Sequence, residues 1–173
     1  MAQRADSIDL TKLAPSPGDG QRLEVDVLPG ELRYGAESYG VDGGAVTARL
    51  DISRTIGGYA LRLRFTAPVT GDCVRCLEPA CVPVEVDARE VDQARTSDEE
   101  LQSPYVDEDE LDLRSWARDA LALAMPGQFL CRPDCAGLCA VCGASLNDAD
   151  PADHEHGGGG DPRWDKLREL KLE

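Results

Sequence analysis

Apolar and polar residues alternate over several stretches of the first 90 residues, which is the pattern of β-strands that bury one face. The first stretch ends at Pro29-Gly30. The next two are joined by Gly57-Gly58, a pair that favours a turn, so they predict a hairpin. The alternating apolar positions are Leu23, Val25 and Val27; Val46, Ala48, Leu50 and Ile52; Tyr59, Leu61, Leu63 and Phe65; and Val82, Val84, Val86 and Ala88.

After residue 110 the spacing of the apolar residues becomes that of an α-helix. The sequence predicts this helix over about residues 111–125, with acidic residues in its first turn, where the helix dipole favours them, and Pro126-Gly127 at its end. The predicted fold class is therefore α+β, an antiparallel sheet of about four strands covered by one amphipathic helix. The apolar stripe of the helix consists of Leu113, Trp116, Ala117, Ala120, Leu121 and Ala124.

The sequence divides into three parts. Residues 1–20 are an extended polar lead-in, and residues 21–128 are the α+β core, in which residues 92–112 form a solvated acidic connector. Residues 129–173 combine a cysteine-rich segment, a Gly-rich linker over 148–160 and a short helix that Asp161 caps, with Pro162 at its first position. We expect this last part to be a small module that zinc stabilises.

The charge balance of the chain is strongly acidic. Its 173 residues include 33 Asp and Glu against 18 Lys and Arg, a net charge of −15, and residues 71–130 alone carry 15 acidic and 5 basic side chains. Proteins that bind nucleic acid without sequence preference usually present a basic field, so the composition argues against that class. Basic proteins are the partners that such a charge favours.

One exception to this charge is a group of arginines on the polar side of the predicted hairpin. Arg49, Arg62 and Arg64 are candidates for contact with RNA phosphates. The alternative, which we favour, is that these arginines pair across strands with Asp51 and other carboxylates.

The chain contains no stretch of about 18 apolar residues, and its opening residues lack the apolar core of a signal peptide. We therefore expect a cytoplasmic protein without a membrane partner. Seven cysteines in a reducing compartment more often bind metal than form disulfides, and their odd number argues against complete pairing.

The cysteine-rich segment over residues 131–143 is the strongest chemical signal in the sequence. Cys139 and Cys142 form a C-x-x-C pair that is followed by Gly143. This is the spacing of a zinc knuckle, a turn that directs two sulfur ligands at one ion. The expected cofactor is a structural Zn²⁺ ion.

The second pair of ligands for this ion has two possible sources. Cys131 and Cys135 are favoured, although three residues separate them. His154 and His156 are the alternative pair, because His-x-His after a short loop also reaches a metal. Either set supplies the four ligands that tetrahedral zinc requires.

A further C-x-x-C pair, Cys73 and Cys76, lies between two predicted strands, with Cys81 nearby. Three interpretations are open: half of a second metal site completed by the C-terminal cysteines, a redox pair, and small residues in a hairpin turn. A redox pair usually stands at a helix N-terminus, which lowers the pKa of the attacking thiol. Pro79 follows here without a βαβ pattern, so the turn is favoured.

Sequence motifs of common enzyme classes are missing from this chain. It contains no G-x-S-x-G, P-loop, H-E-x-x-H or dinucleotide-binding motif. We therefore expect no catalytic residue and no small-molecule substrate. A thiol-redox or zinc-dependent enzyme is the least favoured function.

Several of these stretches together resemble the YceD family of bacterial and plastid proteins, which are linked to the accumulation of large-subunit (23S) ribosomal RNA. The resemblance runs from about residue 60 to the end of the chain, and the C-terminal cysteine string is its most specific part. The matching pieces are Cys73-Val-Arg-Cys-Leu-Glu-Pro79, Asp112-Leu-Arg, Ala124-Met-Pro126, Leu130-Cys-Arg-Pro-Asp-Cys-Ala-Gly-Leu-Cys-Ala-Val-Cys-Gly-Ala-Ser-Leu-Asn147 and Asp161-Pro-Arg-Trp164.

The resemblance implies a non-enzymatic ribosome biogenesis factor that promotes 23S rRNA accumulation and assembly of the large ribosomal subunit. Its partner would be a large-subunit precursor, through 23S rRNA, a basic ribosomal protein or both. The alternative is a zinc-binding adaptor or escort for such a protein, without contact to RNA. Members of the family often carry C-x-C where this chain has His154-Glu155-His156, which favours both histidines as metal ligands.

Overall fold

The computed structural model describes residues 3–14, 16–93, 96, 98, 101–148 and 156. The described residues fall into two compact units. The larger unit contains every strand and helix of the described chain. The smaller unit contains residues 75–77, 132–148 and 156 and consists of turns and bends with one isolated β-bridge. The predicted last helix from Asp161 lies outside the described residues.

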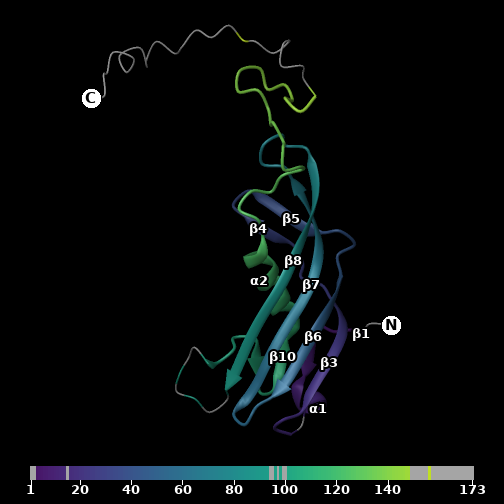
Figure 1. Ribbon diagram of the computed structural model, residues 1–173, viewed down its shortest axis with the longest axis vertical. Coiled ribbons are helices and arrows are strands. Elements are labelled where there is room, and N and C mark those ends of the chain that lie inside the picture. The colour runs from purple at the N-terminus through teal and green to yellow at the C-terminus, as the bar shows by residue number, and fades with distance from the viewer. Residues whose placement is uncertain are drawn as a thin grey trace, which may run out of the picture. The chain divides into compact units, whose positions relative to one another are not determined.

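The main sheet has seven strands among the described residues, in the order β1-β3-β6-β7-β5-β4, and β8 pairs with β7 (Figure 1). All pairs are antiparallel except that of β1 with β3. The sequence predicted β3, β6, β7 and β8, and the hairpin of β6 and β7 is confirmed. The strands are β1 (Gln3–Arg4), β3 (Gly20–Val27), β4 (Leu32–Tyr34), β5 (Glu37–Val41), β6 (Val46–Arg54), β7 (Gly58–Asp72) and β8 (Pro79–Gln93).

A second sheet joins the beginning of the chain to the segment before the main helix. In it β10 (Glu110–Asp112) lies between β2 (Ser7–Asp9) and β9 (Val106–Asp107), and both pairs are antiparallel. Helix α1 (Leu10–Leu13) follows β2 directly, and the Asp9 carboxylate accepts hydrogen bonds from its first backbone N–H groups. Because Leu10 and Leu111 are fully buried, both segments contribute to the core despite their polar composition.

Helix α2 (Leu113–Ala124) packs its apolar stripe against the main sheet, where Figure 1 shows it behind β7 and β8. Its first turn contains no acidic residue, which corrects the sequence prediction. The acidic residues end one position earlier, and Asp112 instead caps the helix by accepting a hydrogen bond from the Ser115 N–H at 2.9 Å. The architecture is α+β, as predicted. The buried residues of α2 are Leu113, Trp116, Ala117, Ala120 and Leu121.

None of the helices in the described residues is long and apolar enough to cross a membrane. The core lies between the main sheet and α2, and it is built from the inward positions of β3, β6, β7 and β8. Leu50, Leu63 and Trp116 are among its largest buried side chains. This packing leaves the other face of the central strands to polar residues.

The packing of α2 can be tested with a substitution at its largest buried side chain. Trp116 is 1% exposed and stacks on Tyr105 with ring centroids 6.4 Å apart. We expect Trp116→Ala to lower the free energy of unfolding by about 3–5 kcal/mol, because it leaves a cavity in the core. Urea denaturation followed by circular dichroism measures this change. Leu123→Ala, at an 89% exposed position of the same helix, should change it by less than about 0.5 kcal/mol. Equal losses in the two variants would contradict the assignment of the buried face.

Candidate metal centres and a charged sheet face

The first group of possible metal ligands consists of Cys73, Cys76, Cys131 and Cys135. Their sulfur atoms all lie within 4.8 Å of one another. In a tetrahedral zinc site with Zn–S bonds of about 2.3 Å, the sulfurs lie about 3.8 Å apart, so the four cysteines fit such an ion. Three of the cysteines are buried, and Cys131 is exposed. The donor set is therefore that of a closed, four-thiolate site.

The turn between β7 and β8 holds the first two of these cysteines. The Cys73 N–H donates to the Glu78 carbonyl at 2.9 Å and closes the turn just before β8 begins. Arg75 extends from this turn, and its guanidinium donates to the Cys135 carbonyl at 2.9 Å. The Arg75 carbonyl in turn accepts the Leu138 N–H at 3.2 Å. The cysteine-bearing backbone is thus fixed by its own hydrogen bonds.

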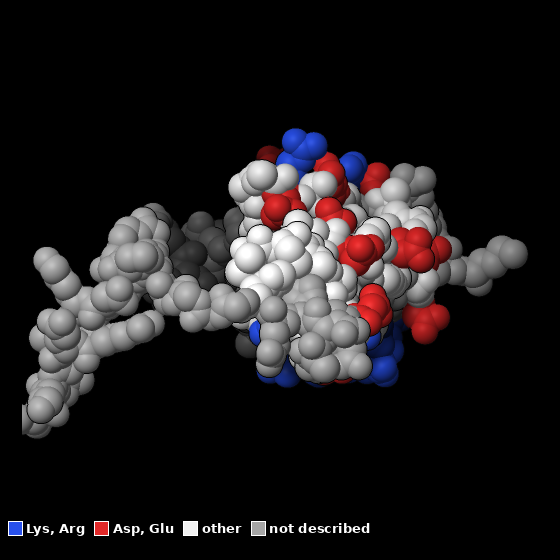
Figure 2. All heavy atoms as spheres, turned by 90° about the horizontal axis from the view of Figure 1, so that it is seen from above, with Lys and Arg blue, Asp and Glu red and all other residues white. Residues whose placement is uncertain are grey.

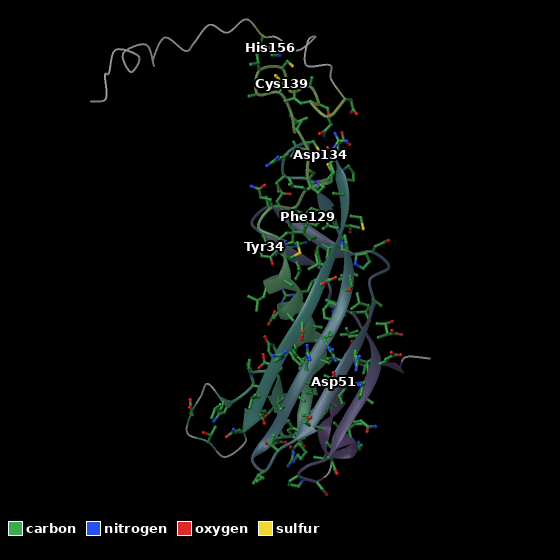
Figure 3. All side chains as sticks on the ribbon, viewed as in Figure 1. Tyr34, Asp51, Phe129, Asp134, Cys139 and His156 are labelled. Carbon is green, nitrogen blue, oxygen red and sulfur yellow. The ribbon has the colours of Figure 1, made fainter. Side chains whose placement is uncertain are left out.

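An aromatic contact positions the chain that leads to Cys131. Phe129, labelled in Figure 3, packs edge-on against Tyr39 with ring centroids 5.0 Å apart. Gly71 leaves room for the Tyr39 ring, because a Cβ atom at position 71 would lie 2.5 Å from that ring. The Phe129 carbonyl accepts the Val74 N–H at 2.9 Å. Strand β7 and the segment before Cys131 are therefore held in register.

Asn147 supports the loop around Cys135, a role that spacing alone did not reveal. Its side-chain nitrogen donates to the Cys135 sulfur at 3.5 Å, and its side-chain oxygen accepts the Ala136 N–H at 2.8 Å. A donor to sulfur favours the thiolate, which is the form that binds metal. The feature of the sequence that could have indicated this role is the polar residue Asn147, shortly after the cysteine segment.

The second group consists of Cys139, Cys142 and His156, whose ligand atoms also lie within 4.8 Å of one another (Figure 3). Backbone hydrogen bonds shape the turn between the two cysteines. The Gly143 N–H donates to the Cys139 carbonyl at 2.8 Å, and Gly143 has a φ of +73°, a conformation that favours glycine. The Val141 N–H points at the Cys139 sulfur at 3.4 Å. This turn has the geometry expected of a metal knuckle.

The structure distributes the predicted ligands differently from their order in the sequence. Cys139 and Cys142 lie together, whereas Cys131 and Cys135 belong to the group that contains the β7–β8 turn. His156 joins the C-x-x-C pair. His154 lies outside the described residues. Cys81 is exposed on β8 and belongs to neither group.

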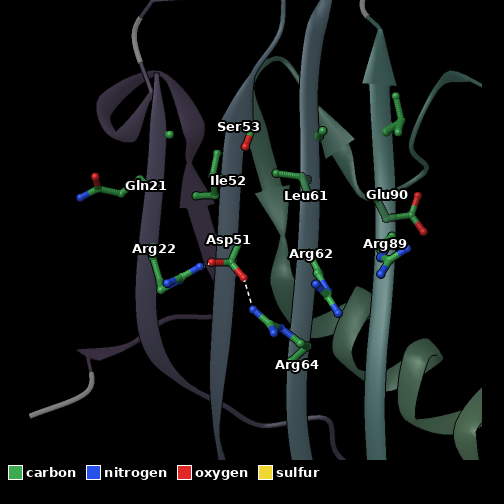
Figure 4. Close-up of a pocket in the computed structure, with 13 residues that line it drawn as sticks. Gln21, Arg22, Asp51, Ile52, Ser53, Leu61, Arg62, Arg64, Arg89 and Glu90 are labelled. Carbon is green, nitrogen blue, oxygen red and sulfur yellow. Dashed lines mark hydrogen bonds and ion pairs between the residues drawn. The ribbon is translucent and has the colours of Figure 1, made fainter. Parts of the chain in front are cut away.

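The polar face of the main sheet carries charged side chains in two rows that cross four strands. The register places opposite charges next to each other at some positions, but each row also sets two arginines opposite one another, Arg62 with Arg89 and Arg49 with Arg64. A hollow of about 600 Å³ on this face is lined by charged side chains of Arg22, Asp51, Arg62, Arg64 and Arg89 (Figure 4). One row runs Arg22, Asp51, Arg62 and Arg89, and the other runs Glu24, Arg49, Arg64 and Asp87.

Asp51 is the centre of this charged face. Its carboxylate pairs with Arg22 at 2.5 Å, with Arg64, and with Arg49 at 3.8 Å. The hydrogen bond from Arg22 lowers the pKa of Asp51, and the one from Arg64 adds to this, against the opposing effect of burial. Arg62 pairs with Asp87 at 2.5 Å. Of the three arginines predicted as RNA contacts, Arg62 and Arg64 thus pair across strands, as the alternative interpretation expected, whereas Arg49 pairs with Asp51 on its own strand β6.

Acidic side chains are also prominent elsewhere on the surface. Figure 2 shows Asp and Glu spread over the face nearest the viewer, with Lys and Arg mainly at its margins. Because the chain carries a net charge of −15, the arginine rows are a local exception to a negative surface.

Comparison with known proteins identifies the family. A family model described as "Large ribosomal RNA subunit accumulation protein YceD" matches residues 61–171, a range that contains all seven cysteines. The chain belongs to the YceD family. This confirms the resemblance that the cysteine string and its flanking residues indicated.

Relatives of this YceD protein occur in bacteria and plants. It is 34% identical over 171 residues to an uncharacterised protein of Mycobacterium tuberculosis, covering 95% of this chain and 80% of that one. An uncharacterised protein of Mycobacterium leprae is 30% identical over 168 residues, covering 94% and 76%. A maize protein named "Large ribosomal RNA subunit accumulation protein YCED homolog 1, chloroplastic" is 28% identical over 135 residues, covering 59% of this chain and 46% of that one. No solved structure matches the chain.

The ion pairs of Asp51 give the fold a predictable pH dependence. Because folding lowers the pKa of Asp51 below its ordinary value of 3.8, the ionised carboxylate stabilises the fold above that value. This contribution is lost as the pH falls through the lowered pKa. We expect Asp51→Asn to lower the free energy of unfolding by about 1 kcal/mol at neutral pH. Urea denaturation at a series of pH values should show the difference shrink below pH 3.8.

Glu24→Gln is the matched control for Asp51→Asn. Glu24 lies on the same sheet face and makes no ion pair among the described residues, so its substitution should have an effect below about 0.5 kcal/mol. A constant difference between wild type and Asp51→Asn at every pH would show that the ion pairs are not its source.

Proposed function

We propose that this YceD protein is a non-enzymatic factor that promotes accumulation of 23S rRNA and assembly of the large ribosomal subunit in the cytoplasm. The observation that carries the proposal is the family match over residues 61–171. The printed name of the maize relative, a large ribosomal RNA subunit accumulation protein, supports the same process. The proposal assigns the chain a binding role within this process.

The geometry of the four-cysteine group supports a binding role. Four thiolates around one ion fill a tetrahedral coordination shell, whereas catalytic zinc sites keep one position for water or substrate. Cys73, Cys76 and Cys135 are also buried. We therefore assign this group a structural Zn²⁺ ion, which supplies binding free energy to folding.

The smaller unit has little other means of stabilisation. Among residues 132–148, only Cys135 and Gly137 are buried, and no helix or extended strand is formed. A segment with so few buried apolar side chains gains little from the hydrophobic effect. A metal bound by its cysteines would offset the loss of conformational entropy on ordering this segment.

The charge distribution favours two kinds of contact with a large-subunit precursor. The acidic side chains within residues 92–112 suit a basic ribosomal protein. Arg49, Arg62 and Arg64 suit rRNA phosphates, together with Arg22 and Arg89 in the same rows. Both contacts are parts of this proposal.

A second candidate is an adaptor or escort for a basic ribosomal protein, without contact to RNA. The observation that favours it is the pairing of all three predicted RNA contacts with carboxylates of the same face. An arginine that already pairs with a carboxylate gains less from a phosphate, because the existing pair must first be broken.

Deletion of the gene tests the ribosomal role. We expect the ratio of large-subunit to small-subunit rRNA to fall in cells that lack the protein, because large-subunit precursors are lost before assembly. Quantitative gel electrophoresis of total RNA measures the ratio, and the full chain supplied on a plasmid should restore it. An unchanged ratio across growth rates and temperatures would refute the proposal.

Substitutions on the charged face distinguish direct contact with RNA from the escort role. Arg89 makes no ion pair among the described residues, so Arg89→Glu adds repulsion toward phosphate without breaking one. With direct RNA contact, this variant should weaken RNA binding and reduce the slope of its salt dependence by about 1. Reversing the charges of Arg49, Arg62 and Arg64 together should weaken RNA binding further. Arg118→Glu, exposed on α2, is the matched control. Unchanged RNA binding, with partners that survive nuclease treatment, would select the escort.

Removal of metal tests the structural role of the four-cysteine group. We expect a chelator to speed backbone amide exchange in residues 132–148 by about tenfold or more, while the strands of the main sheet keep their protection. Hydrogen–deuterium exchange with mass spectrometry measures both regions. The double variant Cys76→Ser and Cys135→Ser should reproduce the effect, and Cys81→Ser should not. Chelation that leaves exchange unchanged would show that metal does not hold this segment.

A further inference from the structure

We propose that Cys139, Cys142 and His156 form a second metal centre, separate from the four-cysteine group, that binds its own zinc-like divalent ion. The inference concerns the metal content of the chain and does not depend on the ribosomal role. It changes the expected stoichiometry from one ion to two.

The first argument is the convergence of three donor atoms of the right kind. Two sulfurs and one imidazole nitrogen lie within 4.8 Å of one another, a separation that a single tetrahedral ion can span. Sulfur and imidazole nitrogen are both preferred ligands of zinc. His156 reaches the cysteines from beyond the segment that contains them, so local sequence spacing does not produce this proximity.

The second argument is the backbone around Cys139, which is shaped by its own hydrogen bonds. The Cys139 N–H donates to the Ala144 carbonyl at 2.8 Å, and Leu138 bridges to Ser145 across the turn. The Val141 N–H lies 3.4 Å from the Cys139 sulfur, where it stabilises a thiolate. The turn therefore directs both sulfurs to one side without the aid of a hydrophobic core.

The two centres differ in charge and in accessibility. Four thiolates with one divalent ion carry a net charge of −2, whereas two thiolates and one neutral imidazole with the same ion are neutral. Cys142 and His156 are exposed and Cys139 is partly buried, while the first group has three buried cysteines. Within the described part of the chain three side chains converge here, which leaves one of four tetrahedral positions for a further ligand. The second centre should therefore exchange its ion more readily.

Native mass spectrometry of the full chain, titrated with zinc alone, tests the number of centres. We expect two ions per chain, and one ion in the double variant Cys139→Ser and Cys142→Ser. The double variant Cys76→Ser and Cys135→Ser should also keep one ion, and Cys81→Ser should keep two. A wild-type maximum of one ion would overturn the proposal. So would the loss of both ions in either double variant.

His156→Ala tests the identity of the nitrogen ligand. We expect it to raise the dissociation constant of the weaker ion at least tenfold and to leave the tighter ion in place. Cobalt substitution adds a spectroscopic readout, because loss of nitrogen from a mixed sulfur–nitrogen set shifts the visible absorption bands. Cys81→Ser, at a position outside both groups, is the paired variant, and it should keep both ions at wild-type affinity. Retention of both ions by His156→Ala would overturn the ligand assignment.

Discussion

The pairing of β7 with β8 is the constraint on which the rest of the structure depends. The two strands are paired continuously from Gly58 and Gln93 to Asp72 and Pro79. One face of this ribbon supplies the core, the other carries the arginine rows, and its turn holds Cys73 and Cys76. Because side chains alternate between faces, a shift of one residue would bring the arginines into the core. The apolar alternation thereby also fixes the positions of two candidate metal ligands.

Hydrogen-bond donors around the cysteine sulfurs help an acidic chain to accommodate thiolates. A four-thiolate ion adds negative charge to a chain whose net charge is already −15. Near Cys135, the Arg75 guanidinium and the Asn147 side-chain amide both donate hydrogen bonds, one to its carbonyl and one to its sulfur. Donors and a positive charge at this distance offset repulsion between thiolates. The smaller unit is therefore organised by polar contacts to backbone and sulfur more than by apolar packing.

The sequence predicted those parts of the fold whose periodic patterns are long. Strands β6, β7 and β8 and helix α2 each show several consecutive repeats of their spacing, so their existence could be deduced. The short strands β1, β4, β9 and β10 have two or three residues each and give no periodic signal. Leu10 and Leu111 are single apolar residues in polar stretches, and only the second sheet explains why they are buried.

The candidate site was predictable in its residues but less so in its grouping. Cysteine type and C-x-x-C spacing identify candidate ligands, because a turn of that length can direct two sulfurs to one ion. Spacing cannot show which pairs combine, since that depends on where the turn after β7 lies in space. Cys131 and Cys135 therefore joined Cys73 and Cys76, and the C-x-x-C pair at Cys139 gained His156.

Gly71 shows how closely the sheet and the cysteine loops are coupled. The ring of Tyr39 occupies the space that any side chain at this position would need, and the same ring contacts Phe129, two residues before Cys131. Even a single methyl group at position 71 would overlap the Tyr39 ring, which packs between β7 and Phe129. A side chain at position 71 would therefore require the Tyr39 ring to move, and with it the ring contact that precedes Cys131.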